Sequence, residues 1–191
     1  MSALATAALP LRIHRPRIAV RLQPVQASVR PAGTEDVAAI HALIEVHSSE
    51  GRLLPRSATE IAAHLDRFVI ATVSGRLVGC VDLAPLSGGT AEVRSLVVAE
   101  HARSNGLGRR LLSAAIARAH HVGFDQLCAF THSPSYFVQA GFSIVPHTWI
   151  PEKIGRDCRS CTSFGRCGQS ALLLPLGGGT SRSVPHGSLN D

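Results

Sequence analysis

Apolar and polar positions follow the periods of strands and helices along residues 28–150. The segment SVRPA begins this stretch as a short strand. Thr34 is expected to cap the helix that follows, because Glu35 and Asp36 then lie where the helix dipole favours acids. The buried face of that helix would consist of Val37, Ile40 and Ile44. The segment SATE at 57–60 is a capping box, which predicts a second short helix.

A hairpin is expected next, where the apolar runs FVIATV and RLVGCVDL flank the pair Ser74–Gly75. After the turn PLSGG, the alternating segment AEVRSLVV predicts a third strand that ends at Val98. Another helix is expected after Gly108, and it should end near Gly123. Its apolar stripe consists of Leu111, Leu112, Ala115, Ile116 and Ala119.

The following segments continue the alternation of strand and helix. LCAFT predicts a strand, Ser133–Pro134 starts a short helix that ends at Gly141, and FSIV is the last clear strand. This order predicts an α/β fold with a central mixed, twisted sheet flanked by helices on both sides. With 191 residues, of which 45% are hydrophobic, the chain has room for one domain with its own core.

We expect four segments along the chain: a disordered or targeting leader at 1–27, the folded domain at 28–150, a cysteine-containing extension at 151–175 and a disordered tail at 176–191. The leader is rich in arginine and lacks acids, which resembles a transit peptide. An unstructured start in an arginine-biased sequence explains the same composition. The expected location is therefore the cytoplasm, or the plastid or mitochondrial matrix if the leader is a transit peptide.

The net charge of +6 does not indicate nucleic-acid binding once it is located along the chain. The first 34 residues hold five arginines and no acid, so the rest of the chain is nearly neutral. The chain also has only one Trp and one Tyr, so basic and aromatic residues do not alternate as in nucleic-acid sites. No apolar run approaches the ~18 residues of a membrane span. We expect neither nucleic acid nor a membrane as a partner.

The five cysteines fall into two groups. Cys80 and Cys128 lie in apolar stretches and are expected in the core. The other three lie close together in the extension. An odd number of cysteines, in a chain without a secretory signal, indicates a reducing compartment.

The clustered residues Cys158, Cys161 and Cys167 begin with a CxxC pair and offer three soft ligands to a structural zinc. Zinc usually has four ligands, and either His147 or Asp157 would be the fourth, although nothing in the spacing selects one of them. The alternative is that three reduced thiols pack the extension against the domain.

The segment RSNGLG at 103–108 lies where the strand ending at Val98 passes into a helix. A P-loop is excluded because the only lysine of the chain lies elsewhere, and a dinucleotide-binding fingerprint is excluded because Leu111 stands at its third glycine. The loop still favours an anion, since glycines let the backbone approach a ligand and the helix start offers unpaired N–H groups. Arg109 and Arg110 add positive charge. The pattern predicts a diphosphate site.

Arg103, Gly106 and Gly108 match the (Q/R)xxGx(G/A) signature of the GNAT superfamily of acyl-CoA-dependent N-acetyltransferases, and the downstream YFVQAGF also resembles that family. The resemblance implies the GNAT fold, with acetyl-CoA as co-substrate. It implies that the loop wraps the pyrophosphate of coenzyme A while backbone groups of the preceding strand pair with the pantetheine arm. The residues then assigned to coenzyme A are Leu96, Val97, Val98, Arg103, Ser104, Asn105, Gly106, Leu107, Gly108 and Arg109.

Four segments resemble the short form of N-acetylglutamate synthase: RLLPRSATE, AEVRSLVV, FTHSPSYFVQAGF and IPEKIGRDCRSCTSFGRC. The resemblance implies direct transfer of an acetyl group from acetyl-CoA to the α-amine of L-glutamate, the first step of arginine biosynthesis. Two alternatives stay open. One is acetylation of another amine, on another amino acid, a small molecule or a protein N-terminus; the other is a non-catalytic module that binds acyl-CoA or senses thiols. A homodimer, in which a second subunit completes the site, is also compatible with the sequence.

The chemistry of this reaction needs a base and a group that stabilises an oxyanion. The glutamate amine must lose a proton before it attacks the thioester, and Glu92 is the expected base, acting through a water, because the family places a glutamate there. A solvated edge carboxylate is the alternative role. A backbone N–H near Leu96 or Val97 would hold the developing oxyanion.

Two residues are candidates for the proton donor to the departing thiolate. Many members of the family have a tyrosine four residues before the GF pair, but that position is Phe137 here. Tyr136 is displaced by one and is expected to point elsewhere on the helix. Thr131 lies near the end of the preceding strand, where the long-form synthases have a hydroxyl residue.

The two carboxylates of glutamate require cations with forked donors. Arg56 follows the LLP segment at a position where the synthases keep a substrate-binding arginine, and an exposed helix-entry arginine is the alternative. Arg94 alternates with Glu92 and Leu96 along the strand. For Arg94, substrate contact and a structural ion pair are both open.

Overall fold

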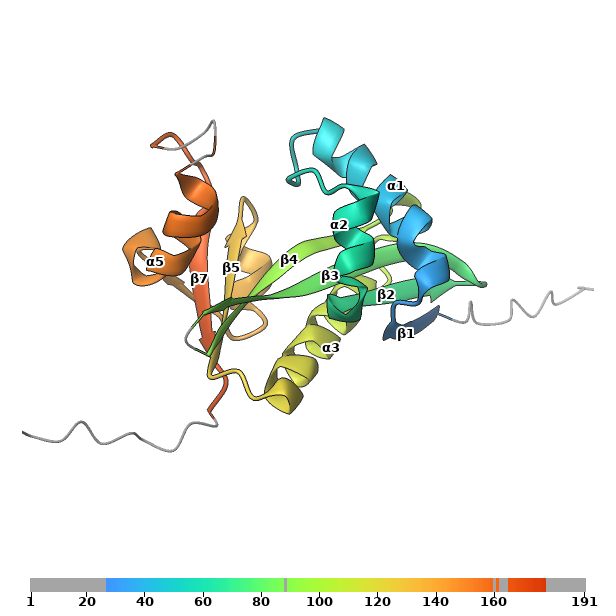
Figure 1. The fold of residues 1–191 in the computed structure, drawn as a ribbon. Coiled ribbons are helices and arrows are strands. Elements are labelled where there is room, and N and C mark those ends of the chain that lie inside the picture. The colour runs from blue at the N-terminus through green and yellow to red at the C-terminus, as the bar shows by residue number, and fades with distance from the viewer. Residues whose placement is uncertain (1–26, 88, 160, 162–164, 178–191) are drawn as a thin grey trace, which may run out of the picture.

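The computed structural model describes residues 27–87, 89–159, 161 and 165–177. It is an α/β fold in which one mixed sheet carries helices on both faces (Figure 1). The expected leader and tail lie outside the described residues, except for residue 27 and residues 176–177. Among the helices that the structure describes, none has the length and apolar character needed to cross a membrane.

Within the described residues the sheet has seven strands, in the order β1-β2-β3-β4-β5-β7-β6. Neighbouring strands are antiparallel except β4 and β5, which run parallel. The strands are β1 Ala27–Pro31, β2 Phe68–Val73, β3 Arg76–Ser87, β4 Thr90–Val98, β5 Gln126–Thr131, β6 Ser143–Val145 and β7 Ser170–Pro175. The mixed α/β sheet expected from the order of elements is confirmed.

Helices cover the sheet from two sides, with α1 and α2 on one face and α3 on the other (Figure 1). The helices are α1 Val37–Ser49, α2 Ala58–Ala63, α3 Leu107–Val122, α4 Pro134–Val138 and α5 Pro151–Lys153. The described residues also form 3-10 turns at Thr34–Asp36, Leu65–Arg67, Glu100–Ala102 and His147–Trp149, and a π-helical turn at Ile154–Cys158.

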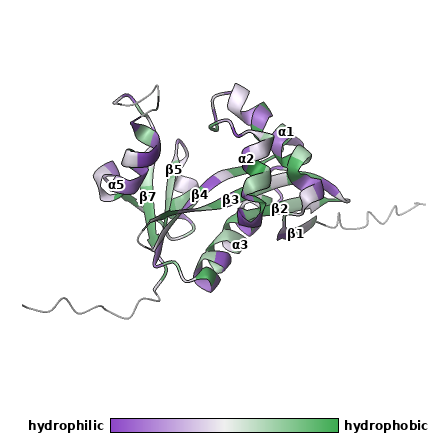
Figure 2. Cartoon of the chain, viewed as in Figure 1, coloured by the Kyte–Doolittle hydropathy of each residue, from purple (hydrophilic) through white to green (hydrophobic). Residues whose placement is uncertain are grey.

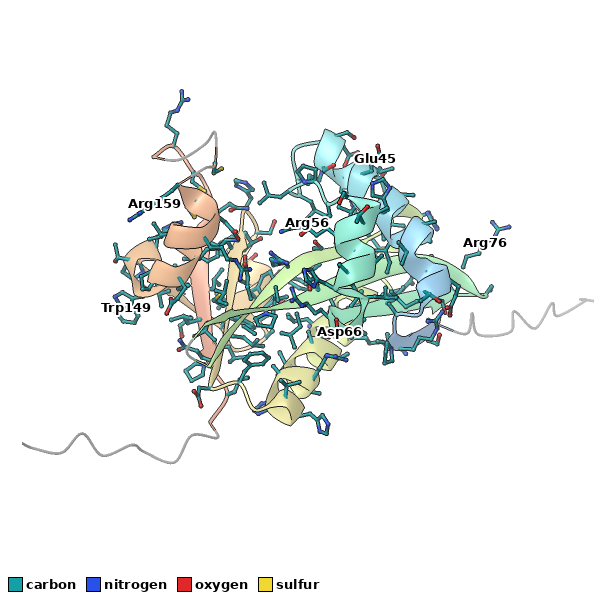
Figure 3. The ribbon with its side chains drawn as sticks, viewed as in Figure 1. Glu45, Arg56, Asp66, Arg76, Trp149 and Arg159 are labelled. Carbon is teal, nitrogen blue, oxygen red and sulfur yellow. The ribbon has the colours of Figure 1, made fainter. Side chains whose placement is uncertain are left out.

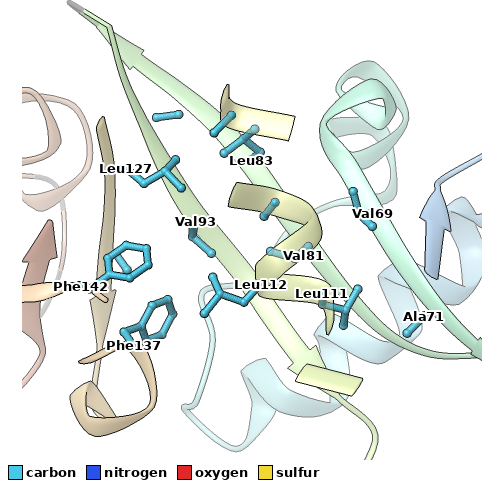
Figure 4. Packing of buried hydrophobic residues seen from close by; sticks show 14 of the residues in the cluster. Val69, Ala71, Val81, Leu83, Val93, Leu111, Leu112, Leu127, Phe137 and Phe142 are labelled. Carbon is cyan, nitrogen blue, oxygen red and sulfur yellow. The ribbon is translucent and has the colours of Figure 1, made fainter. Parts of the chain in front are cut away.

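Alternation along the strands divides the core into a cluster on each face. In β2, Val69 and Ala71 pack on the side of α3, whereas Phe68 and Ile70 pack on the side of α1. The strand β7 is coloured as largely hydrophobic, while β4 and the helices mix both characters (Figure 2). The close view of the α3 side shows Leu83, Val93, Leu111, Leu112, Phe137 and Phe142 in one cluster (Figure 4). Cys80 and Cys128 are fully buried, as expected.

Several turn and cap signals are confirmed. Ser74 and Gly75 both have positive φ, 49° and 78°, which is the type of hairpin turn that matches the twist of β2 and β3. The Ser57 hydroxyl accepts a hydrogen bond from the Glu60 N–H at 3.1 Å and so caps α2. The helix α3 ends at Val122, and Gly123 follows as its C-cap with a φ of 90°.

The expectation that Thr34 caps the first helix is wrong. Residues Thr34–Asp36 form a 3-10 turn, and α1 begins only at Val37. The Asp36 carboxylate accepts a hydrogen bond from the Gly33 N–H at 2.7 Å and pairs with Arg30 at 2.7 and 3.0 Å. Because these partners fix Asp36 at the end of β1, the chain makes a tight turn before the helix can start.

The sheet also continues past the strand FSIV. β7 pairs with β5 along its whole length, from Thr131 opposite Ser170 to Gln126 opposite Pro175, and its other edge pairs with β6. The segment following residue 150 therefore supplies a strand to the interior of the sheet. It is built into the same core as the preceding residues, since Ala171 and Leu172 are buried.

We expect Leu111→Ala to lower the free energy of unfolding by about 2–5 kcal/mol, because Leu111 is fully buried between α3 and the sheet and its loss leaves a cavity. Val122→Ala on the same helix is the matched control, since Val122 is 55% exposed and its change should cost less than about 0.5 kcal/mol. Urea unfolding of both variants measures the difference. Equal losses would contradict this packing.

Candidate active site

A cleft of about 1190 Å³ opens where β4 and β5 part. The two strands pair only from Thr90 to Glu92, although β4 continues to Val98 and β5 to Thr131. The cleft is lined by residues from both strands beyond this point, including Val93 to Val98 and Phe130 to Ser133. Within the part of the chain that the structure describes, the backbone of β4 in this segment thus has no strand partner on the side of β5.

A β-bulge in β4 accompanies this separation. Asp82 of β3 lies opposite Arg94, and Cys80 lies opposite Val97, so two residues of β4 face one residue of β3. Within the bulge Ser95 has a φ of 49°, a conformation that costs energy for a residue with a side chain. A bulge bends its strand and increases the twist, which directs β4 away from β5.

The glycine loop forms one end of the cleft. Gly106 has a φ of 71° and stands at the cap position of α3, which has no side-chain cap, so the first N–H groups of the helix remain available. Of the residues assigned to coenzyme A, all except Asn105 line the cleft. Asn105 instead lies with its amide 3.4 Å from the Ala102 carbonyl. Arg103 donates a hydrogen bond to the Val98 carbonyl at 3.1 Å.

Gly108 makes room for the side chain of Tyr136. A Cβ at residue 108 would lie 2.8 Å from the Tyr136 hydroxyl oxygen, closer than side chains normally approach. That hydroxyl is buried and has no hydrogen-bond partner among the described residues. Burial raises the pKa of Tyr136, and the charge of Arg109 opposes the rise. Tyr136 lines the cleft beside the loop, whereas Phe137, at the position of the family's usual tyrosine, is buried against Phe142.

Glu92 is buried and belongs to a set of three charges. The Lys153 ammonium lies 2.8 Å from Oε1 and 2.9 Å from Oε2 of Glu92, and 2.6 Å from Oδ2 of Asp157. It also lies over the Phe130 ring, 5.5 Å from the centroid. The alternative of a solvated edge carboxylate is wrong for Glu92, because its residue is only 3% exposed and both oxygens face a cation.

The two carboxylates of this set have shifted pKa values in opposite directions. Burial raises the pKa of Glu92, while Lys153 and then Arg94 act to lower it. Burial would also raise the pKa of Asp157, but the hydrogen bond and charge of Lys153 lower it overall. Sequence reasoning does not select Lys153, and the available signal was that it is the only lysine of the chain.

Arg94 forms a buried ion pair with Asp82 across the bulge. Its Nε and one terminal nitrogen donate to the same Asp82 oxygen at 3.1 and 2.8 Å. The other oxygen of Asp82 is buried without a hydrogen-bond partner among the described residues. The structural ion pair, one of the two open roles for Arg94, is therefore present, and Arg94 also lines the cleft.

Arg56 reaches toward the cleft from the residues before α2, whereas Arg76 extends outward from the molecule (Figure 3). The Arg56 side chain is only 16% exposed and pairs with Glu60 at 2.7 Å, so it is not an exposed helix-entry residue. Its Nε is buried and has no hydrogen-bond partner in the part of the chain that is described. Thr131 also lines the cleft, and its hydroxyl accepts a hydrogen bond from the Ser133 N–H at 3.0 Å.

The structure does not support the expected zinc site. Cys158, Cys161 and Cys167 all line the cleft, but no three or more His, Cys, Asp or Glu side chains of the described residues are arranged to hold a metal ion. Of the two candidate fourth ligands, Asp157 pairs with Lys153, and His147 has its ring 5.5 Å from that of Phe130. The thiols instead form part of the cleft wall, and burial raises the pKa of Cys158.

Comparisons with known proteins point to one family. The protein-family model for the Acetyltransferase (GNAT) family matches residues 36–140. An uncharacterised N-acetyltransferase of Chlorobaculum tepidum is 32% identical over 148 residues, which are 78% of this chain and 96% of that protein. An amino-acid acetyltransferase of Neisseria meningitidis is 33% identical over 135 residues, or 70% of this chain. The chain spans only 31% of the length of that enzyme.

Solved structures give the same result. The N-acetylglutamate synthase of Neisseria gonorrhoeae, complexed with coenzyme A and N-acetyl-glutamate, superimposes with a TM-score of 0.72 at 29% identity. The match covers 81% of this chain and 36% of that one. Salmonella typhimurium yncA with its cofactor acetyl-CoA matches with a TM-score of 0.62 at 19% identity, which supports the fold alone.

Asp82→Ala should lower the free energy of unfolding by about 3–5 kcal/mol, because it leaves the Arg94 guanidinium buried without its carboxylate. The double variant Asp82→Ala/Arg94→Met should recover most of that loss, since no buried charge remains. Guanidinium unfolding of the wild type and both variants measures the difference. A double variant as unstable as the single one would show that the pair is not buried as described.

Proposed function

The chain belongs to the acetyltransferase (GNAT) family, and we propose that it transfers the acetyl group of acetyl-CoA to the α-amine of L-glutamate. The observation that carries the proposal is a single cleft with two chemically different ends. One end has an uncapped helix start with arginines, and the cleft is also lined by a buried carboxylate, Glu92, and by Arg56 and Arg94. The relatives named amino-acid acetyltransferase support the choice of acceptor.

The end at residues 103–108 suits coenzyme A. Free N–H groups at the start of α3 and the positive end of its dipole favour the pyrophosphate, and Arg103 and Arg109 add charge. The edge of β4 that faces β5 offers donors and acceptors to the amides of the pantetheine arm beyond Glu92. The gonococcal synthase, which was solved with coenzyme A, supports this assignment.

The other end suits an acceptor that carries both an amine and carboxylates. We assign a glutamate carboxylate to Arg56, which lines the cleft and whose Nε has no hydrogen-bond partner among the described residues. Arg94 contributes positive charge but already holds Asp82, so its role toward the substrate is weaker. Glu92 attracts the substrate ammonium to the same end of the cleft.

The reaction requires one proton to leave the amine and one to reach the thiolate. Glu92 takes the proton of the substrate ammonium through a water, and the free amine attacks the thioester carbonyl. A backbone N–H near Leu96 or Val97 holds the oxyanion, and its collapse breaks the carbon–sulfur bond to give the amide and coenzyme A. Thr131 and Tyr136 both remain candidates for the donor to the thiolate.

The structure distinguishes these two hydroxyls by position. The Tyr136 hydroxyl lies against residue 108 at the start of α3, beside the loop assigned to the pyrophosphate. Thr131 lies at the end of β5, and because its oxygen accepts a hydrogen bond from Ser133, its own proton is left to donate. Phe137, at the position of the usual tyrosine, is buried in the core against Phe142.

A different amine acceptor is the second candidate function. The wall formed by Phe130, Cys158 and Cys161 carries no fixed charge, and such a wall would also suit an acceptor with a less polar side chain. The relative that matches 96% of its own length is itself an uncharacterised N-acetyltransferase. The two candidates share the cofactor and the base and differ only in the acceptor.

We expect L-glutamate to give the highest kcat/KM when acetyl-CoA is supplied with each proteinogenic amino acid and free thiol is followed. Arg56→Ala should raise KM for glutamate by about tenfold or more, the change that ~1.4 kcal/mol of binding produces. Arg76→Ala, at the exposed hairpin turn, is the matched control and should leave KM unchanged. Faster turnover of another amino acid, with no effect of Arg56→Ala, would favour the second candidate.

Glu92→Gln should lower kcat by about 10²–10⁴-fold, because an amide cannot accept the proton of the substrate ammonium. Calorimetry should show acetyl-CoA binding unchanged, since the base does not contact the phosphate end. Glu45→Gln on the exposed surface of α1 is the control and should retain full turnover. Full turnover of Glu92→Gln would exclude Glu92 as the base.

A further inference from the structure

The buried ammonium of Lys153 joins two carboxylates that are far apart in the sequence. Lys153 is 6% exposed, and its nitrogen lies within 2.9 Å of both oxygens of Glu92 and 2.6 Å from Asp157. Because the ammonium contacts both oxygens, the plane of the Glu92 carboxylate is fixed. Neither Lys153 nor Asp157 has a role in the reaction as proposed so far.

We propose that Lys153 and Asp157 are positioning residues, which hold the Glu92 carboxylate in place and allow it to accept a proton without leaving a buried charge unpaired. The inference rests on the proposed role of Glu92 as the base. It makes the segment following residue 150 part of the active site, since α5 and the π-helical turn supply both residues.

The charges of Glu92, Lys153 and Asp157 explain how Glu92 can become protonated in a buried site. Two carboxylates and one ammonium carry one net negative charge. When Glu92 takes up a proton, Lys153 and Asp157 remain as a neutral pair, so neither ion is left alone in the buried site. With only Glu92 and Lys153 present, the same proton would leave an unpaired ammonium. Asp157 therefore balances the charge of Lys153 when Glu92 accepts the proton that the reaction releases.

Local structure places the two residues for this role. Lys153 and Asp157 are four residues apart on one helical stretch, so their side chains lie on one face. The stretch widens into a π-helical turn at Ile154–Cys158, a feature often found at functional sites. Ile150, which is 1% exposed, anchors the start of the stretch, and Arg156 ties it to β3 through the Pro85 carbonyl at 2.9 Å.

Other charged groups around Glu92 leave this balance intact. Arg94 lowers the pKa of Glu92 but is itself neutralised by Asp82. Cys128, opposite Glu92 on β5, stays a neutral thiol because burial raises its pKa. Arg156 lies 3.6 Å from Asp157, but its side chain is 41% exposed, so water screens its charge.

Two variants should shift the pH profile of kcat/KM in opposite directions. Activity requires ionised Glu92, so the acidic limb of the profile follows its pKa. Lys153→Met removes the cation that lowers this pKa, so the limb should move to higher pH. Asp157→Asn removes the carboxylate that raises it, so the limb should move to lower pH. The profile is measured with whichever amine the wild type acetylates fastest.

Asp66→Asn, at an exposed carboxylate, is the control and should leave the profile in place. If Lys153→Met fails to fold, Asp157→Asn still tests the direction in which the acidic limb moves, because the new side chain has the same shape. Shifts in the same direction, or none, while Glu92→Gln still lowers kcat, would overturn the positioning role and leave Glu92 as the base. Full turnover of Glu92→Gln would instead refute the proposed mechanism.

A second measurement does not depend on turnover. Because the chain has one lysine, protein grown with side-chain ¹⁵N-lysine should give one ammonium signal, observable because the buried group exchanges slowly with water. Glu92→Gln and Asp157→Asn should each move this signal, and Lys153→Met should abolish it. A signal that neither carboxylate variant moves would overturn the proposal.

Discussion

The separation of β4 from β5 is the constraint on which the rest of the site depends. Two parallel strands at the centre of a sheet normally satisfy each other's backbone groups, and here they do so over three residues only. The bulge at Ser95 bends β4, and beyond it β4 still pairs with β3 while its edge toward β5 has no strand partner among the described residues. A cleft with bare amides along one wall follows directly. The glycine loop and the buried carboxylate lie at its two ends.

The segment after residue 150 completes both the sheet and the site. β7 lies between β5 and β6 and so holds β5 in the position that leaves the cleft open. The helical stretch before β7 places Lys153 against Glu92, which lies on a strand near the centre of the sheet. Buried charges are stable only when their partners are fixed. The packing of the residues after 150 and the charged state of the Glu92–Lys153 pair therefore depend on each other.

Much of the fold could be predicted because each strand and helix buries one face, which leaves a period in the sequence. The glycine loop was recognisable because its chemistry is local, with glycines, arginines and a helix start within a few residues. β7 was missed because ALLLP is a short apolar run without alternation, next to a glycine-rich segment. Lys153 was missed because its partner lies 61 residues away, and no local pattern encodes such a pair.

The burial of Lys153 affects whether acetyl-CoA can acetylate the protein itself. An acetyl thioester reacts with any unprotonated amine nearby, and the sole lysine of this chain lies in the wall of the cleft assigned to acetyl-CoA. Its nitrogen lies against two carboxylates and the residue is only 6% exposed, so the side chain is not free to approach a thioester bound in the cleft. The same ion pairs that contact Glu92 thus restrain the one lysine of the chain and hinder its acetylation.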